Sequence, residues 1–131
     1  RKPVRGSSSQ RYGCTGYHVN PRRGSCRHFH DGVDIAAPVG RWVRAVADGY
    51  VAYAGYSPWD SGPRAYIVIT VPAGGVDSVS AHLEPMRKVK AGRAVKRSAA
   101  SGAVGMTGLT SGPHLHWEVR KHGRTVDPQK V

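Results

Sequence analysis

Short runs of β-forming residues, separated by Gly, Pro and Asp turns, dominate this 131-residue chain. The runs 42–47 and 50–56 flank Asp48-Gly49, a dipeptide that favours a tight hairpin because both turn positions accept positive φ. No window of ten or more residues shows a convincing helical period of apolar side chains. We therefore expect a mostly β protein, with antiparallel sheets because successive hairpins reverse the chain direction.

Two further hairpins are predicted downstream. The run YIVITV at 66–71 is typical of a buried strand, and the alternating segment 76–83 would return beside it after a Pro/Gly turn. A strand at 115–120, a turn at His122-Gly123 and a short final strand complete the pattern.

The chain length predicts one compact domain. Its first residues, 1–11, are basic, Ser-rich and without periodicity, so we expect a flexible N-terminal arm or the end of a linker, followed by the domain at 12–131. The irregular stretches 57–64 and 91–112 are the longest, and such loops on a β scaffold commonly border a binding groove.

The chain is strongly basic, with 20 Lys and Arg against 8 Asp and Glu and a formal net charge of +12. This charge is either a solvated surface or an attraction to a polyanion. The positive residues are scattered, and no basic helical stripe or RNA-binding aromatic motif accompanies them, so we expect no nucleic-acid partner. No apolar run reaches the roughly 20 residues of a membrane span and no signal segment is visible, so we expect a soluble, mature or trimmed product.

Cys14 and Cys26 are the two cysteines, and they enclose a segment rich in Gly, Pro and Arg. A disulfide between them would contribute roughly 3 kcal/mol and would indicate an oxidising compartment. Two free buried thiols are the alternative. We favour the disulfide, because an irregular loop offers little core in which to bury a thiol.

Histidines occur in a pattern that suggests a site. His114 and His116 lie two apart in a predicted strand, so both imidazoles face the same side of the sheet. A lone His-x-His has exposed strand histidines as its ordinary explanation. A second cluster, His30 and Asp34, surrounds Gly32, where a turn can bring the imidazole and the carboxylate together.

His82, at the end of a predicted strand, is the third element of the pattern. Two imidazoles and a carboxylate form the ligand set of a catalytic zinc with one open position. Residue spacing alone leaves open which of the five groups bind metal and which act on substrate. Four ligands would close a structural site, whereas three would leave two histidines for catalysis.

The segments HDGVDIAAP, SAHL and GMTGLTSGPHLHWEV resemble, in order and spacing, three motifs of the lysostaphin-type zinc metallopeptidases, which include the LytM-domain endopeptidases. The resemblance covers about residues 28–128 and implies a lysostaphin-like catalytic domain. Carried over by matching position, it implies that His30, Asp34 and His116 bind one Zn²⁺ per chain. His82 and His114 would then face the attacking water.

The chain has no HExxH glutamate, so a histidine must act as the base. The family usually has a tyrosine two residues before the histidine of the SAHL motif, where it supports the transition state. Ser80 occupies that position here, and its shorter hydroxyl could support the transition state through a water. Tyr66 or Tyr53 from a neighbouring strand is a candidate replacement.

The resemblance implies a secreted or envelope-facing zinc endopeptidase that cleaves peptide cross-bridges or stems of bacterial peptidoglycan. We expect a monomer whose partners are peptidoglycan peptides and anionic wall polymers, which would attract a basic enzyme. The alternative is a non-catalytic relative that binds peptidoglycan or activates another hydrolase. The sequence leaves open which bond is cut, and whether the source is a bacteriolysin, a remodelling enzyme or a phage lysin.

Overall fold

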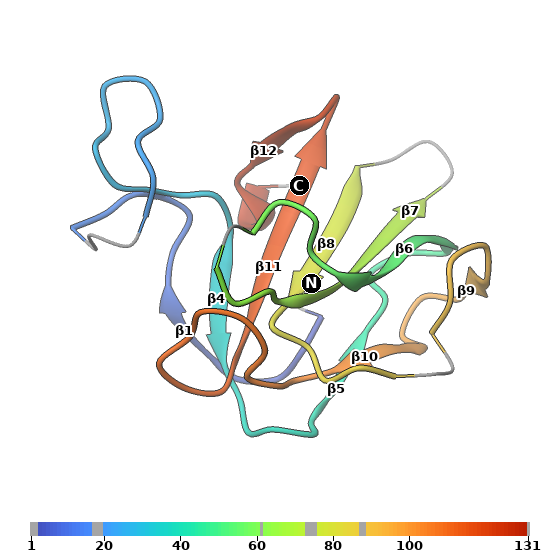
Figure 1. Cartoon of the computed structure of the whole chain (residues 1–131). Coiled ribbons are helices and arrows are strands. Elements are labelled where there is room, and N and C mark those ends of the chain that lie inside the picture. The colour runs from blue at the N-terminus through green and yellow to red at the C-terminus, as the bar shows by residue number, and fades with distance from the viewer. Residues whose placement is uncertain (1–2, 17–19, 61, 73–75, 87–88, 131) are drawn as a thin grey trace.

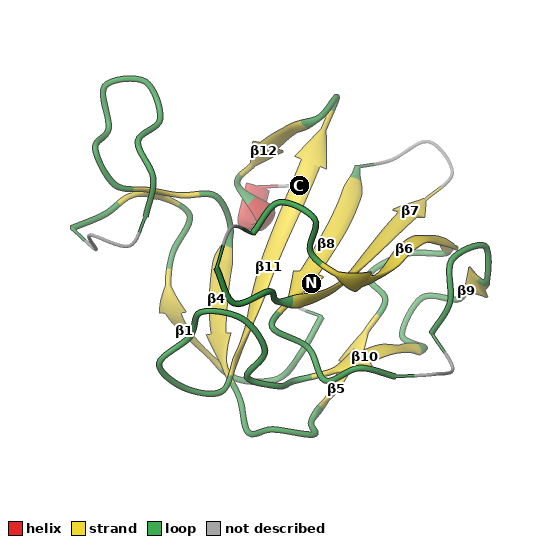
Figure 2. Ribbon diagram, in the orientation of Figure 1, coloured by secondary structure: helices red, strands yellow, loops and turns green. Residues whose placement is uncertain are grey.

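The computed structural model describes residues 3–16, 20–60, 62–72, 76–86 and 89–130. Strands and loops make up almost all of this part of the chain, with one short 3-10 helix, η1, near its end (Figure 2). The elements are β1 (Ser7–Gln10), β2 (Gly13–Cys14), β3 (Phe29–His30), β4 (Val33–Ala36), β5 (Trp42–Arg44), β6 (Gly49–Tyr56), β7 (Tyr66–Pro72), β8 (Asp77–Ala81), β9 (Ala94–Val95), β10 (Ala100–Ala103), β11 (His114–Lys121), β12 (Arg124–Val126) and η1 (Pro128–Lys130).

One large sheet organises the domain, in the strand order β1-β4-β11-β8-β7-β6-β9 (Figure 1). Strand β12 pairs with the C-terminal end of β11. Two small ladders, β10-β5 and β2-β3, complete the structure. Each of these pairings is antiparallel. The predicted mostly β fold with antiparallel sheets is therefore confirmed.

Strand β11 has two different faces. Leu115, Trp117 and Val119 are almost fully buried and belong to the main hydrophobic core. Because side chains alternate along a strand, the histidines on either side of Leu115 lie on the opposite face. The core thus fixes which face of the sheet presents the histidines.

Two of the predicted hairpins are present. Strands β7 and β8 pair in the register Val68↔Ser80, although the turn residues 73–75 lie outside the described part of the chain. Strands β11 and β12 pair across His122 and Gly123, whose φ values of 52° and 78° fit a tight two-residue hairpin turn.

The hairpin predicted at Asp48-Gly49 is wrong. Strand β5 pairs with β10, whereas β6 pairs with β7 and β9, so the chain passes from a small ladder into the main sheet at this point. Asp48 instead accepts a hydrogen bond from the Arg97 backbone N–H at 2.7 Å. Gly49 serves close packing, because a Cβ there would lie 2.4 Å from the Val71 carbonyl oxygen.

The prediction of an arm at 1–11 also needs correction for the residues described from Pro3 onward. Strand β1 forms the edge of the main sheet, with Ser7 opposite Ala36 and Gln10 opposite Asp34. Val4 is 4% exposed and packs into the core. Ladder hydrogen bonds come from the backbone, so a Ser-rich segment can add a strand without any apolar alternation.

Residues 91–112, predicted to be irregular, contain the short strands β9 and β10. Strand β9 has only two residues and β10 consists of Ala, Ser and Gly, so neither produces the β-branched alternation that indicates a strand. In the described residues, no helix is long and apolar enough to cross a membrane.

The predicted disulfide between Cys14 and Cys26 is present. Cys14 pairs with Phe29 in the β2–β3 ladder, where the adjacent pair is Gly13 and His30. The disulfide therefore braces the backbone beside one of the candidate site histidines.

Gly32 lies where the chain between His30 and Asp34 passes β11, and a Cβ there would lie 2.4 Å from the Trp117 carbonyl oxygen. We expect Gly32→Ala to lower the free energy of unfolding by about 2 kcal/mol or more, because the β4–β11 ladder must move apart. Urea denaturation measures the change. Gly16→Ala, where a Cβ would meet no atom within 4 Å, is the matched control. Equal stability of the two variants would contradict this explanation.

Candidate metal centre

Four different segments bring the five predicted site residues together. His30 ends β3 and Asp34 lies in β4, while His114 and His116 share one face of β11. His82 directly follows β8, which pairs with β11 on the side away from β4. The central position of β11 therefore places its two histidines between the other three residues.

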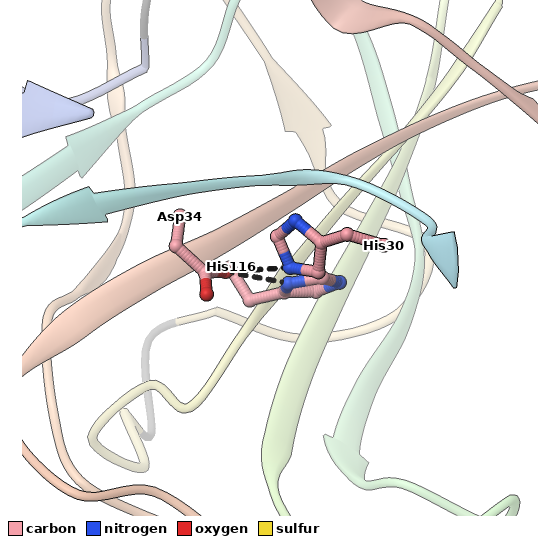
Figure 3. Close-up of side chains that lie close together, drawn as sticks. All are labelled: His30, Asp34 and His116. Carbon is pink, nitrogen blue, oxygen red and sulfur yellow. Dashed lines mark hydrogen bonds and ion pairs between the residues drawn. The ribbon is translucent and has the colours of Figure 1, made fainter. Parts of the chain in front are cut away.

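Asp34 is the centre of the first group. Its Oδ1 lies 2.8 Å from Nδ1 of His116 and 3.2 Å from Nε2 of His30, as the dashed lines in Figure 3 show. One ligand atom from each of the three residues falls within 4.8 Å of the others. Two imidazole nitrogens and a carboxylate oxygen thus converge on one point.

The last residue of β1, Gln10, and the residue after it, Arg11, support this group. The ring Nδ1 of His30 lies 2.9 Å from the Arg11 carbonyl oxygen and donates its proton there, which leaves Nε2 as the lone-pair nitrogen facing Asp34. Gln10 donates from its amide to Oδ2 of Asp34 at 3.2 Å. The interpretation of residues 1–11 as an arm missed both contacts, because no sequence signal near them indicates a strand.

The two charged groups of the cluster shift each other's pKa. Burial alone would raise the pKa of Asp34, but hydrogen bonds from His116 and His30 outweigh it and hold that pKa well below its usual range. Burial alone would lower the pKa of His116, whereas its hydrogen bonds to Asp34 and Glu118 raise it to about 9. In the metal-free protein a proton therefore occupies the centre of the cluster at neutral pH.

His82 and His114 form the second group, with ring centroids 4.8 Å apart. His82 Nδ1 donates to the Thr107 carbonyl at 2.6 Å, and His114 Nδ1 donates to the Gly112 carbonyl at 2.9 Å. Each ring therefore keeps Nε2 as its lone-pair nitrogen. That of His114 lies 3.8 Å from Asp34 Oδ1, beside the first group.

His82 is suited to remain neutral. Burial lowers its pKa below 6.5, and the charges of His114 and His116 lower it further, against the opposing effect of the Thr107 hydrogen bond. A neutral imidazole at pH 7 can accept a proton. His82 also has φ 64°, in the left-handed region, which turns its side chain out of the alternation of β8.

Ser80 does not lie at the cluster. It is 7% exposed and pairs with Trp117 on one side and Val68 on the other, both of which point into the core. Ser80 therefore faces the core side of the sheet, and the left-handed backbone at His82 takes the histidine out of the strand alternation that Ser80 follows. The prediction that Ser80 supports the transition state is not compatible with this placement.

Tyr53 and Tyr66 were the candidate replacements for Ser80. Tyr53 donates its hydroxyl to the Tyr56 carbonyl at 2.6 Å, and Tyr66 packs edge-on against the Tyr56 ring with centroids 5.2 Å apart. The hydrogen bonds and ring contacts of the described residues join neither tyrosine to a site histidine. The role of either tyrosine in the transition state stays a prediction.

The residue-by-residue predictions overlooked Glu118. Its Oε1 lies 3.0 Å from Nε2 of His116, and its Oε2 accepts from Arg120 at 2.8 Å. The signal was available, since the alternation H-x-H-x-E-x-R places all four side chains on one face of a strand.

The fold is that of the lysostaphin catalytic domain. Residues 28–128 match peptidase family M23, and the chain belongs to this family.

Relatives of known name agree with this assignment. The chain is 37% identical over 116 residues to the DD-carboxypeptidase/endopeptidase Mpg of Neisseria meningitidis, covering 88% of this chain and 25% of that protein. It is 36% identical over 102 residues to the peptidoglycan DD-endopeptidase ShyB of Vibrio cholerae, and the match covers 78% of this chain and 23% of ShyB. The chain thus spans about a quarter of the length of these relatives.

Solved structures share the whole fold. A zinc-containing peptidase from Vibrio cholerae superposes with a TM-score of 0.79 at 28% identity, over 99% of this chain and 39% of that one. The catalytic domain of the antimicrobial peptidase lysostaphin from Staphylococcus simulans superposes with a TM-score of 0.76 at 27% identity. This match covers 95% of this chain and 90% of the lysostaphin domain. The second comparison shows that this chain corresponds to nearly all of a separately crystallised catalytic domain.

The donor set of His30, Asp34 and His116 fits a zinc ion. Imidazole nitrogen and carboxylate oxygen are common Zn²⁺ ligands, and three protein ligands leave a position open for a substrate or water. Each imidazole also hydrogen-bonds through its other ring nitrogen, as metal-ligating histidines usually do. These three residues could therefore hold Zn²⁺.

The raised pKa of His116 predicts a pH-dependent stability of the zinc-free protein. Because its pKa rises from 6.5 to about 9 on folding, the contribution is fully present below pH 6.5 and is lost as pH rises through 9. Between pH 7 and pH 10 we expect the free energy of unfolding to fall by about 2 kcal/mol. Urea denaturation in the presence of a chelator measures this fall.

His116→Gln is the control for that experiment, since it removes the titrating group and should remove the slope. The zinc-loaded protein should show no such loss, because metal binding requires the deprotonated ring. A zinc-free stability that stays level or rises across this range would contradict the assignment.

Proposed function

We propose that this chain is a zinc-dependent endopeptidase that hydrolyses peptide bonds in bacterial peptidoglycan. The observation that carries the proposal is the convergence of His30, Asp34 and His116 on one point, with two further histidines beside it. Membership of peptidase family M23 supports the reaction class.

His30, Asp34 and His116 would hold the ion by Nε2, Oδ1 and Nδ1, the atoms that face one another across the cluster. Bound Zn²⁺ supplies a Lewis acid that polarises a carbonyl and lowers the pKa of water toward 7. The low pKa of Asp34 keeps its carboxylate charged, so a negative ligand is ready to neutralise part of the metal's charge.

His82 and His114 would move the protons of the reaction. Their Nδ1 protons are held by the carbonyls of Thr107 and Gly112, so the free Nε2 atoms can accept a proton from the attacking water. The resulting imidazolium can stabilise the developing oxyanion or deliver its proton to the leaving amine. Since the ring of His82 is neutral at pH 7, it is ready to act as the base.

Peptidoglycan is the proposed substrate because relatives such as ShyB are named peptidoglycan DD-endopeptidases. Segment 105–113 contacts His82 and His114 through Thr107 and Gly112, and segment 57–60 reaches Arg120 through Trp59. These two segments would form the walls of the groove that receives the peptide. A secreted or envelope-facing, bacteriolytic or wall-remodelling role is consistent with the Cys14–Cys26 disulfide, which persists in oxidising compartments. The net charge of +12 would favour anionic wall polymers, and we propose that the domain acts as a monomer.

Purified peptidoglycan tests the function directly. We expect the protein to release soluble fragments with new amino termini, and a chelator followed by dialysis to abolish release until zinc is restored. Mass spectrometry of fragments from walls of defined cross-bridge type identifies the bond that is cut. Binding of peptidoglycan without fragment release would favour the non-catalytic alternative.

Substitutions should separate metal ligands from catalytic histidines. We expect Asp34→Ala to lose both zinc and activity, and His114→Ala to keep about one zinc per chain while turnover falls by about 10²–10⁴-fold, as removal of an acid–base group does. Metal analysis and fragment release measure the two effects. His122→Asn, at the exposed β11–β12 turn, is the matched histidine control. Full activity in His114→Ala would remove that residue from the mechanism.

A further inference from the structure

Glu118 lies beside the candidate metal centre without being one of its three converging groups. It follows His116 by two residues on β11, so both side chains lie on the same face of the sheet. The Oε1 atom of Glu118 is 3.0 Å from Nε2 of His116. The two side chains are only 14% and 17% exposed, so little water competes for this contact.

The second carboxylate oxygen is held from the other side. Oε2 accepts from both Nε and Nη2 of Arg120, at 3.1 and 2.8 Å. The Arg120 guanidinium in turn lies over the Trp59 ring, 4.7 Å from its centroid. Glu118 therefore has both of its oxygens engaged, and its orientation toward His116 is fixed.

This contact decides which nitrogen of His116 is available. A carboxylate accepts hydrogen bonds only, so Nε2 must carry the proton that it shares with Glu118. Nδ1 faces Oδ1 of Asp34 at 2.8 Å, so in the metal-free protein it carries a proton as well. A metal held by Asp34 would take the place of that proton, while Glu118 keeps the proton on Nε2. The wrong tautomer would place a proton where the metal should bind.

Glu118 also differs from the partners of the other site histidines. His30, His82 and His114 each donate Nδ1–H to a neutral backbone carbonyl. Among the hydrogen bonds of the described residues, His116 is the site histidine whose outward nitrogen meets a carboxylate. A negative acceptor makes the imidazole a stronger electron donor than a carbonyl does.

We infer that Glu118, held by Arg120, is the positioning residue that sets the tautomer of His116 and strengthens it as a zinc ligand. This inference rests on the proposed function, since it concerns the same metal centre. Glu118 is not one of the three groups that could hold the metal, and it would act through His116.

Zinc affinity, measured by competition with a chromogenic chelator at pH 7.5, tests the inference. We expect Glu118→Ala to bind zinc about 10–100-fold more weakly than the unchanged protein. Glu118→Gln keeps an acceptor oxygen but loses the charge, so its affinity should fall between the two. Glu84 is the other glutamate of the chain and is exposed. Glu84→Gln is therefore the matched control and should bind zinc normally.

The ring proton of His116 gives a readout that general loss of stability would not produce. In the zinc-loaded protein, its Nε2–H should give a slowly exchanging downfield NMR signal, which shifts upfield in Glu118→Gln and stays in place in Glu84→Gln. If Glu118→Ala fails to fold, the affinity and the proton signal of Glu118→Gln decide the question.

Zinc affinity of Glu118→Ala within about twofold of the unchanged protein, or an unshifted ring proton in Glu118→Gln, would overturn the inference. That result would leave the proposed function intact, provided that the unchanged protein binds zinc and cleaves peptidoglycan. Absence of zinc binding in the unchanged protein would overturn both.

Discussion

The pairing of β11 between β4 and β8 is the constraint on which the rest of the structure depends. It sets His116 opposite Asp34 on one side and opposite Ala81 on the other. Because Leu115 and Trp117 are buried in the core, a shift of one residue in this register would move the histidines to the wrong face. The same apolar packing that stabilises the sheet therefore positions the candidate metal ligands.

Around this strand, each imidazole of the site is oriented by a second partner. Backbone carbonyls of Arg11, Thr107 and Gly112 hold three of the rings, and Glu118 holds the fourth. These partners come from the residue after β1, from the loop between β10 and β11, and from β11 itself. Such supporting contacts fix the tautomers, and they divide the four rings into two that would donate to a metal and two that would accept protons.

Turn residues and strand patterns in the sequence predicted the hairpins whose two strands are neighbours along the chain. The β7–β8 and β11–β12 hairpins follow from short turns between β-rich runs, and the His122-Gly123 turn follows from its backbone preference. The Asp48-Gly49 hairpin failed because β10, far along the sequence, competes for β5. Strand β1 was missed because its edge pairing uses backbone groups and leaves no side-chain pattern.

The sequence by itself determined the mostly β fold class, the disulfide pair and the five groups that meet at the site. Side-chain chemistry and the two-residue alternation of a strand are local properties, so they can be identified without the tertiary structure. Only the tertiary structure decided which ring nitrogens face inward, that Ser80 points to the core, and that Arg11 and Glu118 support the ligands. The physical reason is that orientation depends on hydrogen-bond partners supplied by neighbouring strands and loops. Those partners are set by sheet register, which a single chain segment does not encode.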